Sequence, residues 1–183
     1  MHKLKKVKLE KALTFLEPGP LLLVTTFDGQ KNNVMTISWS MPLDFAGRFV
    51  LCTGPWNYSF GALRKTKECV LCVPGPQLLK TAVQIGMVSG EDTDKFKKFH
   101  LTARPASCVR APLLEDCVAC VECTVEKFLP SYGIFVLQAV EVWQNSSCAD
   151  PRLVHAVGDG TFCADGEKFN FRRLMKEKLP PGL

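Results

Sequence analysis

The chain has 183 residues, of which 46% are hydrophobic and 22% are charged. This length and composition predict one domain, residues 1–183, with its own core. No apolar run comes near the ~20 residues that a membrane-spanning helix needs, and no signal-peptide core follows the basic start of the chain. We therefore expect a cytoplasmic protein without a membrane partner.

The formal net charge of +5 comes largely from the two ends of the chain, which we interpret as solvated basic N- and C-terminal extensions. The basic residues of these extensions are Lys3, Lys5, Lys6, Lys8, Lys11, Arg172, Arg173, Lys176 and Lys178. Neither extension combines its charge with interleaved aromatic residues on a helix that suits a nucleic-acid groove, so we expect no nucleic-acid partner.

Nine cysteines raise the alternatives of disulfides, a metal site or redox chemistry. Most of them lie among apolar residues in segments that look like strands, as in 69–72 and 117–123. Residues three apart on a strand point to opposite faces, so these Cys-x-x-Cys pairs cannot chelate one ion. We expect free thiols that pack as small hydrophobic side chains, Cys163 included, and no metal site.

Turn signals divide the first half of the chain into short elements. The predicted strands are 21–26, 33–40, 48–53 and 68–73, with a hairpin-like turn at Asp28-Gly29. The predicted helices are 59–67, 77–86 and 94–99. We expect Asn57 or Ser59 to cap the first helix and Thr93 to cap the third.

The second half of the chain is predicted to be mostly β. The predicted strands are 117–125, 134–143, 161–164 and 168–169, and residues 130–133 form a turn between the first two. Short strands with few helices and no regular βαβ alternation predict a mainly β fold, an antiparallel barrel with helical insertions.

The segment 33–40 is the first candidate for a site. Asn33, Met35, Ile37 and Trp39 would share one face of a strand, and Val34, Thr36, Ser38 and Ser40 the other. Neither face is plainly a core face. The strand either hydrogen-bonds a flat polar ligand or is a sheet edge whose hydroxyl groups face water.

Three further segments are candidates. Asn57, Tyr58 and Ser59 begin a helix, whose free N–H groups suit a phosphate, although plain capping by Asn57 or Ser59 is the more common reason for such residues. Ser89 and Gly90 allow a tight turn before Lys95, which is either a support for an electron-rich ring or a solvated lysine. His155 with Gly158, Gly160 and Phe162 suggests a close backbone approach, but a lone histidine is more often structural.

Common catalytic signatures are missing from the sequence. There is no phosphate-binding loop, no nucleophile elbow and no His-Glu-x-x-His, and the Gly158-Asp159-Gly160 stretch does not complete a dinucleotide fingerprint. Hydrolase and ATPase activities are not supported, and a nicotinamide donor would bind without a Rossmann domain.

Taken together and in this order, the candidate segments resemble the flavin reductase-like, FMN-binding split-barrel family, and most closely its flavoredoxin-like branch. The resemblance extends from about Pro20 to Phe162. It is carried by 23–26 with Asp28-Gly29, 33–39, 57–60, 68–71, Ser89-Gly90, Asp92, 94–96, Leu101-Thr102, 111–113 and Glu122-Cys123. Many relatives carry a basic residue at the position of Asn57, so the charge partner of the phosphate here is left open between Arg64, Lys65 and no side chain.

The resemblance implies an antiparallel split barrel that forms a homodimer, with FMN near the subunit interface. It implies that Asn33 and Trp39 flank the isoalloxazine ring and that backbone groups from Met35 through Ile37 to Ser38 bond its polar edge. By the same likeness Thr36, Ser38 and Ser59 meet the phosphate or ribityl chain, beside the stretches of Asn57 and Tyr58 and of Ser89 and Gly90. Lys95 would lie near the ring and Phe162 would cover it.

The function implied is an FMN-binding oxidoreductase or electron-transfer flavoprotein that accepts hydride or electrons at flavin N5. NAD(P)H or a protein electron donor would be its partner. A flavin reductase and a tight electron carrier remain open within this class, and a non-catalytic flavin- or haem-binding split-barrel module is the alternative outside it.

Overall fold

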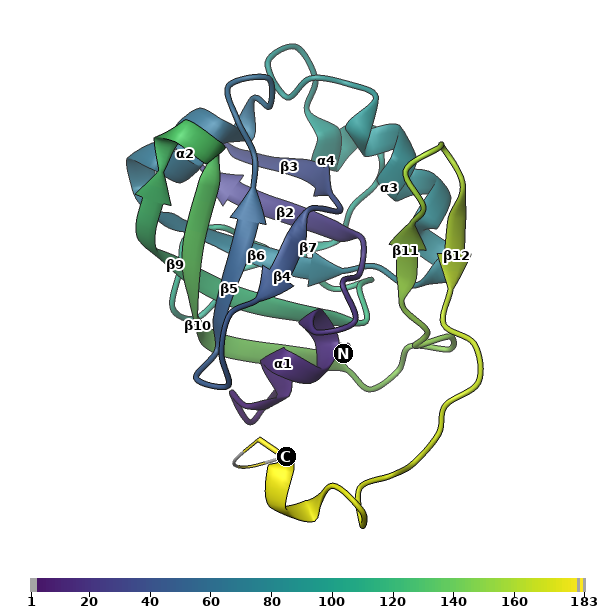
Figure 1. The fold of residues 1–183 in the computed structure, drawn as a ribbon. Helices are drawn as coiled ribbons and strands as arrows, with labels where there is room; N and C mark the ends of the chain where they lie inside the picture. Colours follow the sequence, from purple (N-terminus) through teal and green to yellow (C-terminus); the bar gives the residue numbers. More distant parts are fainter. Residues whose placement is uncertain (1–2, 181, 183) are drawn as a thin grey trace.

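The computed structural model describes residues 3–180 and 182, and it is mainly β-structure with short helices (Figure 1). The main sheet consists of β1 (Leu4–Val7), β2 (Leu22–Phe27), β3 (Asn32–Ile37), β4 (Ser40–Pro42), β5 (Arg48–Cys52), β6 (Glu68–Val73), β9 (Ala119–Leu129) and β10 (Ile134–Asn145). Two smaller sheets pair β7 (Ala103–Arg104) with β8 (Leu113–Leu114) and β11 (Val154–Ala156) with β12 (Phe162–Ala164).

Four helices and three 3₁₀ turns join these strands in the described part of the chain. They are α1 (Lys11–Leu16), α2 (Ser59–Thr66), α3 (Leu79–Gly86), α4 (Lys95–Lys98), η1 (Pro76–Leu78), η2 (Pro130–Tyr132) and η3 (Lys176–Lys178). Among the described residues no helix has both the length and the apolar character required to cross a bilayer.

The main sheet is antiparallel and follows the order β3-β2-β6-β9-β10-β5-β4, with β1 added to β10. Its two end strands, β3 and β4, are consecutive in the chain and are separated only by Ser38 and Trp39. The sheet therefore curls until its ends meet at this two-residue corner. The predicted mainly β, antiparallel fold is confirmed, and the predicted strand 33–40 is corrected to two strands with a corner between them.

Both faces of β3 are buried, which corrects the expectation that neither face belongs to a core. Met35 and Ile37 pack inside the curled sheet with Leu22, and Val34 packs on the other face with Ile85. Helices α3 and α4 lie against that second face of β3 (Figure 1). The polar residues of β3 are therefore held within the protein, where each needs a partner.

The predicted helices exist, but their predicted caps do not. Tyr58 is the N-cap of α2 and makes no side-chain capping bond, while the amide of Asn57 donates to Thr53 Oγ1 over 3.0 Å. Asp94, not Thr93, caps α4, because its carboxylate accepts the backbone N–H of Lys97. The predicted helix over 77–86 is divided into η1 and α3.

One of the two chain ends differs from the expectation of solvated extensions. The N-terminal one is structured, since β1 pairs with β10 and α1 buries Ala12, Leu13, Phe15 and Leu16. The predicted strand over 168–169 is absent. Residues 166–180 follow β12 as a mostly irregular, exposed segment, which we call the arm (Figure 1).

The nine cysteines are all free thiols. Cys69 and Cys123 are buried inside the sheet and Cys72 on its other face, as strand alternation predicts, and burial raises the pKa of Cys69 to about 12. Cys163 is exposed, so the prediction that it packs is wrong. The described residues contain no group of three or more histidine, cysteine or acidic side chains that could hold a metal ion.

Candidate functional site

Three buried polar side chains meet where β2 and β3 approach the start of α2. The amide of Asn33 donates to Ser59 Oγ over 2.8 Å, and the hydroxyl of Thr26 donates to the same oxygen over 3.2 Å. All three residues are buried. A hydroxyl oxygen has two lone pairs and one hydrogen. Because both lone pairs of Ser59 are used, its hydrogen remains available for an acceptor.

A cavity of about 220 Å³ opens beside this cluster. It is lined by Thr26, Asp28, Lys31, Asn33, Tyr58, Ser59, Gly61 and Ala62. Its floor includes the first turn of α2, where backbone N–H groups lack partners within the helix and carry partial positive charge. A cavity with hydroxyl, amide and helix N-terminal donors is suited to a phosphate-sized anion.

Lys31 adds a positive charge at this cavity. Its ammonium donates to the carbonyl of Gly90 over 3.0 Å and lies 4.6 Å from the centre of the Tyr58 ring. Hydrogen bonding with Tyr58 raises the pKa of Lys31 above its ordinary value. The carboxylate of Asp28, which also lines the cavity, already accepts the backbone N–H groups of Gln30 and Lys31.

Gly90 closes one side of the cluster by direct contact. A Cβ at this position would lie 2.2 Å from Asn33 Oδ1, so a side chain here would displace the amide that bonds Ser59. Ser89, the preceding residue, is exposed. The predicted Ser89-Gly90 stretch therefore supports the site through the glycine, which allows the close approach.

A second pocket, of about 400 Å³, shares Lys31 with the first and is also lined by Gly90. The other residues that line it are Asn32, Glu91, Asp92, Thr93, Asp94, Phe96 and Ala103. The three carboxylates disfavour an anion here, so a phosphate group is expected in the smaller cavity.

The outer edge of β3 is held by α3 and α4. The Lys95 ammonium donates to the carbonyls of Val34 (2.9 Å) and Ile85 (3.1 Å), and the Thr36 hydroxyl donates to Ala82 O (2.6 Å). Burial lowers the pKa of Lys95 to about 8. Since the Val34 carbonyl points away from β2, the backbone groups of Thr36, two residues on, do so as well.

The corner between β3 and β4 carries exposed aromatic and unpaired polar groups. Trp39 is 66% exposed, and the neighbouring Ser40 hydroxyl is buried without a hydrogen-bond partner, alone in this respect among described side chains. The backbone N–H of Cys52 donates to Trp39 O. Two further exposed aromatic residues, Trp56 and Tyr132, lie in segments joined by a bond from Thr53 N to Gly133 O.

The structure brings together only part of the predicted set. Asn33, Tyr58 and Ser59 line the small cavity and Gly90 lies against the Asn33 side chain, whereas Thr36 and Lys95 lie on the α3 side of β3. Asn57 does not contact Met35 directly. Its amide donates to Thr53 Oγ1, and that hydroxyl donates to Met35 Sδ over 4.0 Å. Phe162, on β12, packs against the core on the α3 side, and Ile37 is buried in the inner core.

His155 is structural in its contacts. Its ring nitrogens lie 3.3 Å from Gly19 O and 3.0 Å from Asp165 Oδ1, which fastens the β11–β12 hairpin to the segment before β2.

Sequence reasoning missed Lys31, and it gave no individual role to Thr26 or Ser40 although both lay in segments it singled out. Of the two basic residues proposed for the phosphate, Arg64 lies over the rings of Phe60 and Phe128, and Lys65 donates to Asp28 O. Neither lines the cavity, because both point away from the first turn of α2. No sequence pattern pointed to Lys31, because only the folded chain brings it over Tyr58 at the start of α2.

Comparisons with known proteins agree with this fold. The sequence profile of the "Flavin reductase like domain" family matches residues 15–162. A protein of Escherichia coli (strain K12), "Uncharacterized protein YddH", is 27% identical over 188 residues, which cover 92% of this chain and 98% of that protein. An uncharacterized protein of Archaeoglobus fulgidus is 30% identical over 124 residues, with coverage of 66% and 70%.

Solved structures share the fold. An FMN-binding domain of a flavin reductases-like enzyme from Shewanella baltica superimposes with a TM-score of 0.84 at 24% identity, covering 92% of this chain and 97% of that one. Flavoredoxin of Desulfovibrio vulgaris (Miyazaki F) gives a TM-score of 0.77 at 21% identity, covering 83% and 89%. The fold is therefore the antiparallel split barrel, and with a profile match over residues 15–162 the chain belongs to the flavin reductase-like domain family.

Proposed function

We propose that this chain is an FMN-dependent oxidoreductase or electron carrier that holds the phosphate of FMN in the cavity at the start of α2. The observation that carries the proposal is Ser59, whose oxygen accepts hydrogen bonds from Asn33 and Thr26 and whose hydrogen is left for an anionic oxygen. The FMN-binding and flavoredoxin relatives of the same fold support the choice of cofactor.

The residues present suit the whole cofactor. The cavity of about 220 Å³ accepts the phosphate, with Lys31 as its charge partner. The outward backbone groups of Thr36 and Ser38 offer hydrogen bonds to a flat polar ring, and Trp39 offers aromatic cover. The unpaired hydroxyl of Ser40 supplies one more polar contact beside Trp39.

FMN, when bound, supplies hydride and electron chemistry at N5. The chain binds and orients it: the buried cluster holds the phosphate, and the edge of β3 fixes the polar rim of the ring. Lys95 acts behind that edge, because its two bonds hold the Val34 carbonyl against the end of α3 and keep a positive charge near β3. We propose Phe162 as cover from the β11–β12 hairpin.

We also propose a homodimer with FMN near the interface, located in the cytoplasm. Exposed aromatic residues at the β3–β4 corner and in the loops beside it, Trp39, Trp56 and Tyr132, support a partner surface there. NAD(P)H or a protein electron donor reduces the protein, and the proposal includes no membrane or nucleic-acid partner.

Titration with FMN and with riboflavin tests the site, because riboflavin lacks the phosphate. We expect FMN to bind at least about tenfold more tightly, since charge-assisted bonds to the phosphate are each worth about 1.5–3 kcal/mol. Ser59→Ala should reduce this preference, whereas the exposed Ser89→Ala should leave it unchanged. Equal affinity for the two flavins would place the phosphate elsewhere, and absence of any flavin binding would end the proposal.

Lys31→Met tests the proposed charge partner. We expect FMN affinity to fall about tenfold and riboflavin affinity to stay the same, because only the phosphate loses an interaction. Lys65→Met is the matched control, since Lys65 bonds the Asp28 carbonyl and does not line the cavity. Both affinities can be followed by the change in flavin fluorescence.

Reduction of the FMN-loaded protein by NADH, NADPH and a ferredoxin-type donor in parallel tests the redox part. Turnover of NAD(P)H with free flavin indicates a reductase, and reduction of tightly retained FMN by a protein donor indicates a carrier. Bound FMN that no donor reduces contradicts both and favours the non-catalytic binding module.

A further inference from the structure

The arm, residues 166–180, exposes large apolar side chains that the rest of the described chain does not cover. The exposed fractions are 71% for Phe169, 59% for Phe171, 85% for Leu174 and 49% for Met175. Such a cluster on a soluble surface marks an interaction site. The family profile ends at residue 162, so the arm lies outside the region that the profile matches.

The arm is partly organised for docking. The N–H of Met175 donates to Phe171 O over 3.0 Å, which closes one helical turn before η3. At this spacing Phe171, Leu174 and Met175 share one face, and Arg172, Arg173 and Lys176 point elsewhere. An apolar stripe with a basic flank is the form in which short helical segments enter grooves.

An apolar groove of matching chemistry lies between α1 and the loop after β4. Two adjoining hollows, of about 400 and 220 Å³, share Leu13 and Phe45. The other residues that line them are Leu9, Glu10, Glu17, Pro42, Leu43, Asp44, Ala46 and Gly47. Phe45 is 62% exposed and Leu43 is 45% exposed.

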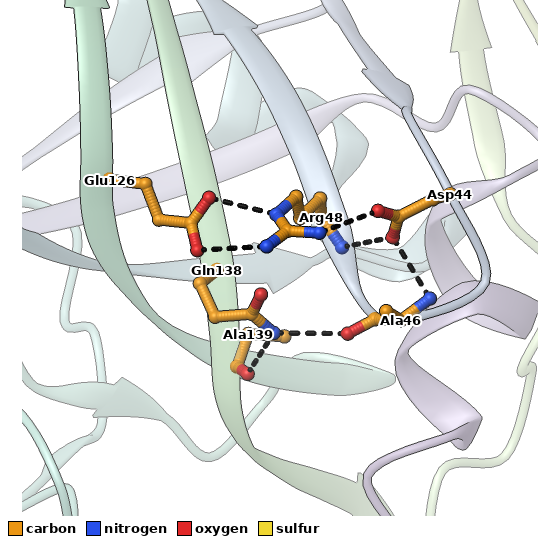
Figure 2. A network of polar contacts seen from close by, with 6 residues as sticks. All are labelled: Asp44, Ala46, Arg48, Glu126, Gln138 and Ala139. Carbon is orange, nitrogen blue, oxygen red and sulfur yellow. Dashed lines mark hydrogen bonds and ion pairs between the residues drawn. The ribbon is translucent and has the colours of Figure 1, made fainter.

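The loop that forms one wall of this groove takes part in the network of polar contacts drawn in Figure 2. Arg48 lies between two carboxylates, with Nε 2.8 Å from Glu126 Oε2 and a terminal nitrogen 3.0 Å from Asp44 Oδ2. Asp44 also accepts the N–H of Ala46, and the Gln138 amide donates to Ala46 O. Residues 43–47 are therefore held in place before any partner arrives, which lowers the entropic cost of docking.

Charge favours the arm as the occupant. Residues 166–180 contain five basic and two acidic side chains. Glu10 and Glu17 border the groove and have no ion-pair partner among the residues described, and Asp44 is already paired with Arg48. The arm also ends near this place, since a Cβ on Gly182 would lie 2.8 Å from Glu10 Cγ.

We propose that the arm of one subunit docks in the α1–β4 groove of a second copy of this chain. Within its own chain the arm reaches α1 yet leaves its apolar side chains in solvent. The groove continues into an exposed stripe of alternate residues, Trp39, Met41, Leu43 and Phe45, which stays uncovered within one chain. A second copy covers the stripe and brings its own arm to the groove, and symmetry repeats the contact.

Comparing the full-length protein with a variant that lacks residues 166–183 tests the docking. We expect at least about a tenfold rise in the dimer dissociation constant by analytical ultracentrifugation, and faster amide exchange in 43–47. Phe171→Ser with Leu174→Ser should reproduce the loss, whereas Lys168→Ser, outside the apolar face, should not. Unchanged exchange and association after the deletion would overturn the proposal.

A mixing experiment separates a second copy from the chain's own groove. One variant lacks residues 166–183 and keeps its groove; the other carries Phe45→Asp and keeps its arm. We expect the groove of the arm-less subunit to regain protection from exchange in the mixture, because arms come from the other subunit. If each variant lost protection from exchange in the groove and mixing did not restore it, the arm would dock within its own chain, which would contradict the proposal.

Charge exchange supplies an independent check. Glu10→Lys with Glu17→Lys should weaken the dimer, and combining these changes with Arg172→Glu and Arg173→Glu should restore it. Absence of restoration, or arm-dependent binding to anionic lipid vesicles without any effect on the dimer, would count against the proposal. This inference rests on the proposed dimer. Its tests measure association and amide exchange and need no flavin, so a negative result would not count against the proposed FMN site.

Discussion

Glu122 is a fully buried carboxylate on β9 whose work is structural. It accepts the N–H groups of Ser107, Cys108 and Val109 over 2.9, 2.6 and 3.1 Å, and the indole N–H of Trp143 over 2.7 Å. If the carboxylate were lost, the buried N–H of Val109 and the part-buried indole N–H of Trp143 would lose their acceptor. Glu122 therefore fixes the 107–109 segment against the outer face of the sheet.

Glu122→Gln should lower the free energy of unfolding by about 2–4 kcal/mol, because one acceptor oxygen becomes an NH₂ group that faces other donors. Urea unfolding measures the loss, and hydrogen exchange should accelerate in 107–109. Glu126→Gln, at a partly exposed ion pair, serves as the control and should cost less than about 1 kcal/mol. Equal losses in the two variants would contradict the assigned role.

Lys95 gives the fold a pH dependence of known sign. Burial lowers its pKa from 10.5 to about 8 in the folded state, so between these values the unfolded chain binds more protons. Stability contributed by this residue consequently rises with pH across that window. We expect wild type to gain on the order of 1 kcal/mol relative to Lys95→Met between pH 7.5 and 9.5, measured by urea unfolding.

The exposed Lys97→Met provides the comparison for Lys95, and its stability should run parallel to wild type with pH. If Lys95→Met also ran parallel to wild type, the buried ammonium would have an ordinary proton affinity, and its proposed role behind β3 would lose its electrostatic part.

At the scale of residues, the sequence indicated several residues that the structure brings together but not their assembly. Asn33 was recognisable on a strand of mixed polarity, Ser59 at a helix start and Gly90 at a turn. Their meeting depends on contacts between segments that are far apart in the chain, which local patterns do not contain. Lys31 was invisible for the same reason, since only the folded hairpin brings it over Tyr58.

Among the elements, the loop before α4 shows how closely backbone and side chain are fitted. Gly90→Ala would place a Cβ 2.2 Å from Asn33 Oδ1. We expect about 1–3 kcal/mol of lost stability from this overpacking, together with weaker FMN binding as Asn33 leaves Ser59. Gly166→Ala, where no atom lies within 4 Å, should change neither quantity. Thermal unfolding and flavin titration provide the two measurements.

Prediction of the elements succeeded where the apolar pattern was strong. The strand over 68–73 was predicted within its observed bounds because its residues are buried on both faces. The break after Ile37 was missed, since the alternation of polar and apolar residues runs through the corner unchanged. Helix α1 was missed because the basic residues around it were interpreted as solvated, although Leu13 and Leu16 anchor it to the core.

For the whole molecule, the exposed stripe along β4 is the surface at which we propose that two copies meet. Met41 is 52% exposed in the middle of this stripe. Met41→Asp should raise the dimer dissociation constant at least about tenfold, because a charge would be buried without a partner. Met87→Asp, at a site 78% exposed outside the stripe, is the matched control. A dimer unaffected by Met41→Asp would place the interface elsewhere.

The barrel class was predictable because it depends on the number and spacing of short strands, whereas the two-sided burial of the sheet was not. Helices α3 and α4 cover the outer face through contacts between distant segments, such as Lys95 with Val34. This covering turns a strand of mixed polarity into a buried one.

The corner at Ser38 and Trp39 has a consequence for how the chain can be cut and rejoined. The consecutive strands β3 and β4 lie at opposite ends of the strand order. This dipeptide is therefore the covalent link between the two ends of the sheet. A circular permutant with new termini between Ser38 and Trp39, and with the present termini linked, would keep every strand pairing but lose the covalent link between β3 and β4. Its free energy of unfolding, compared with that of the wild type, would show how much this link contributes to the stability of the sheet.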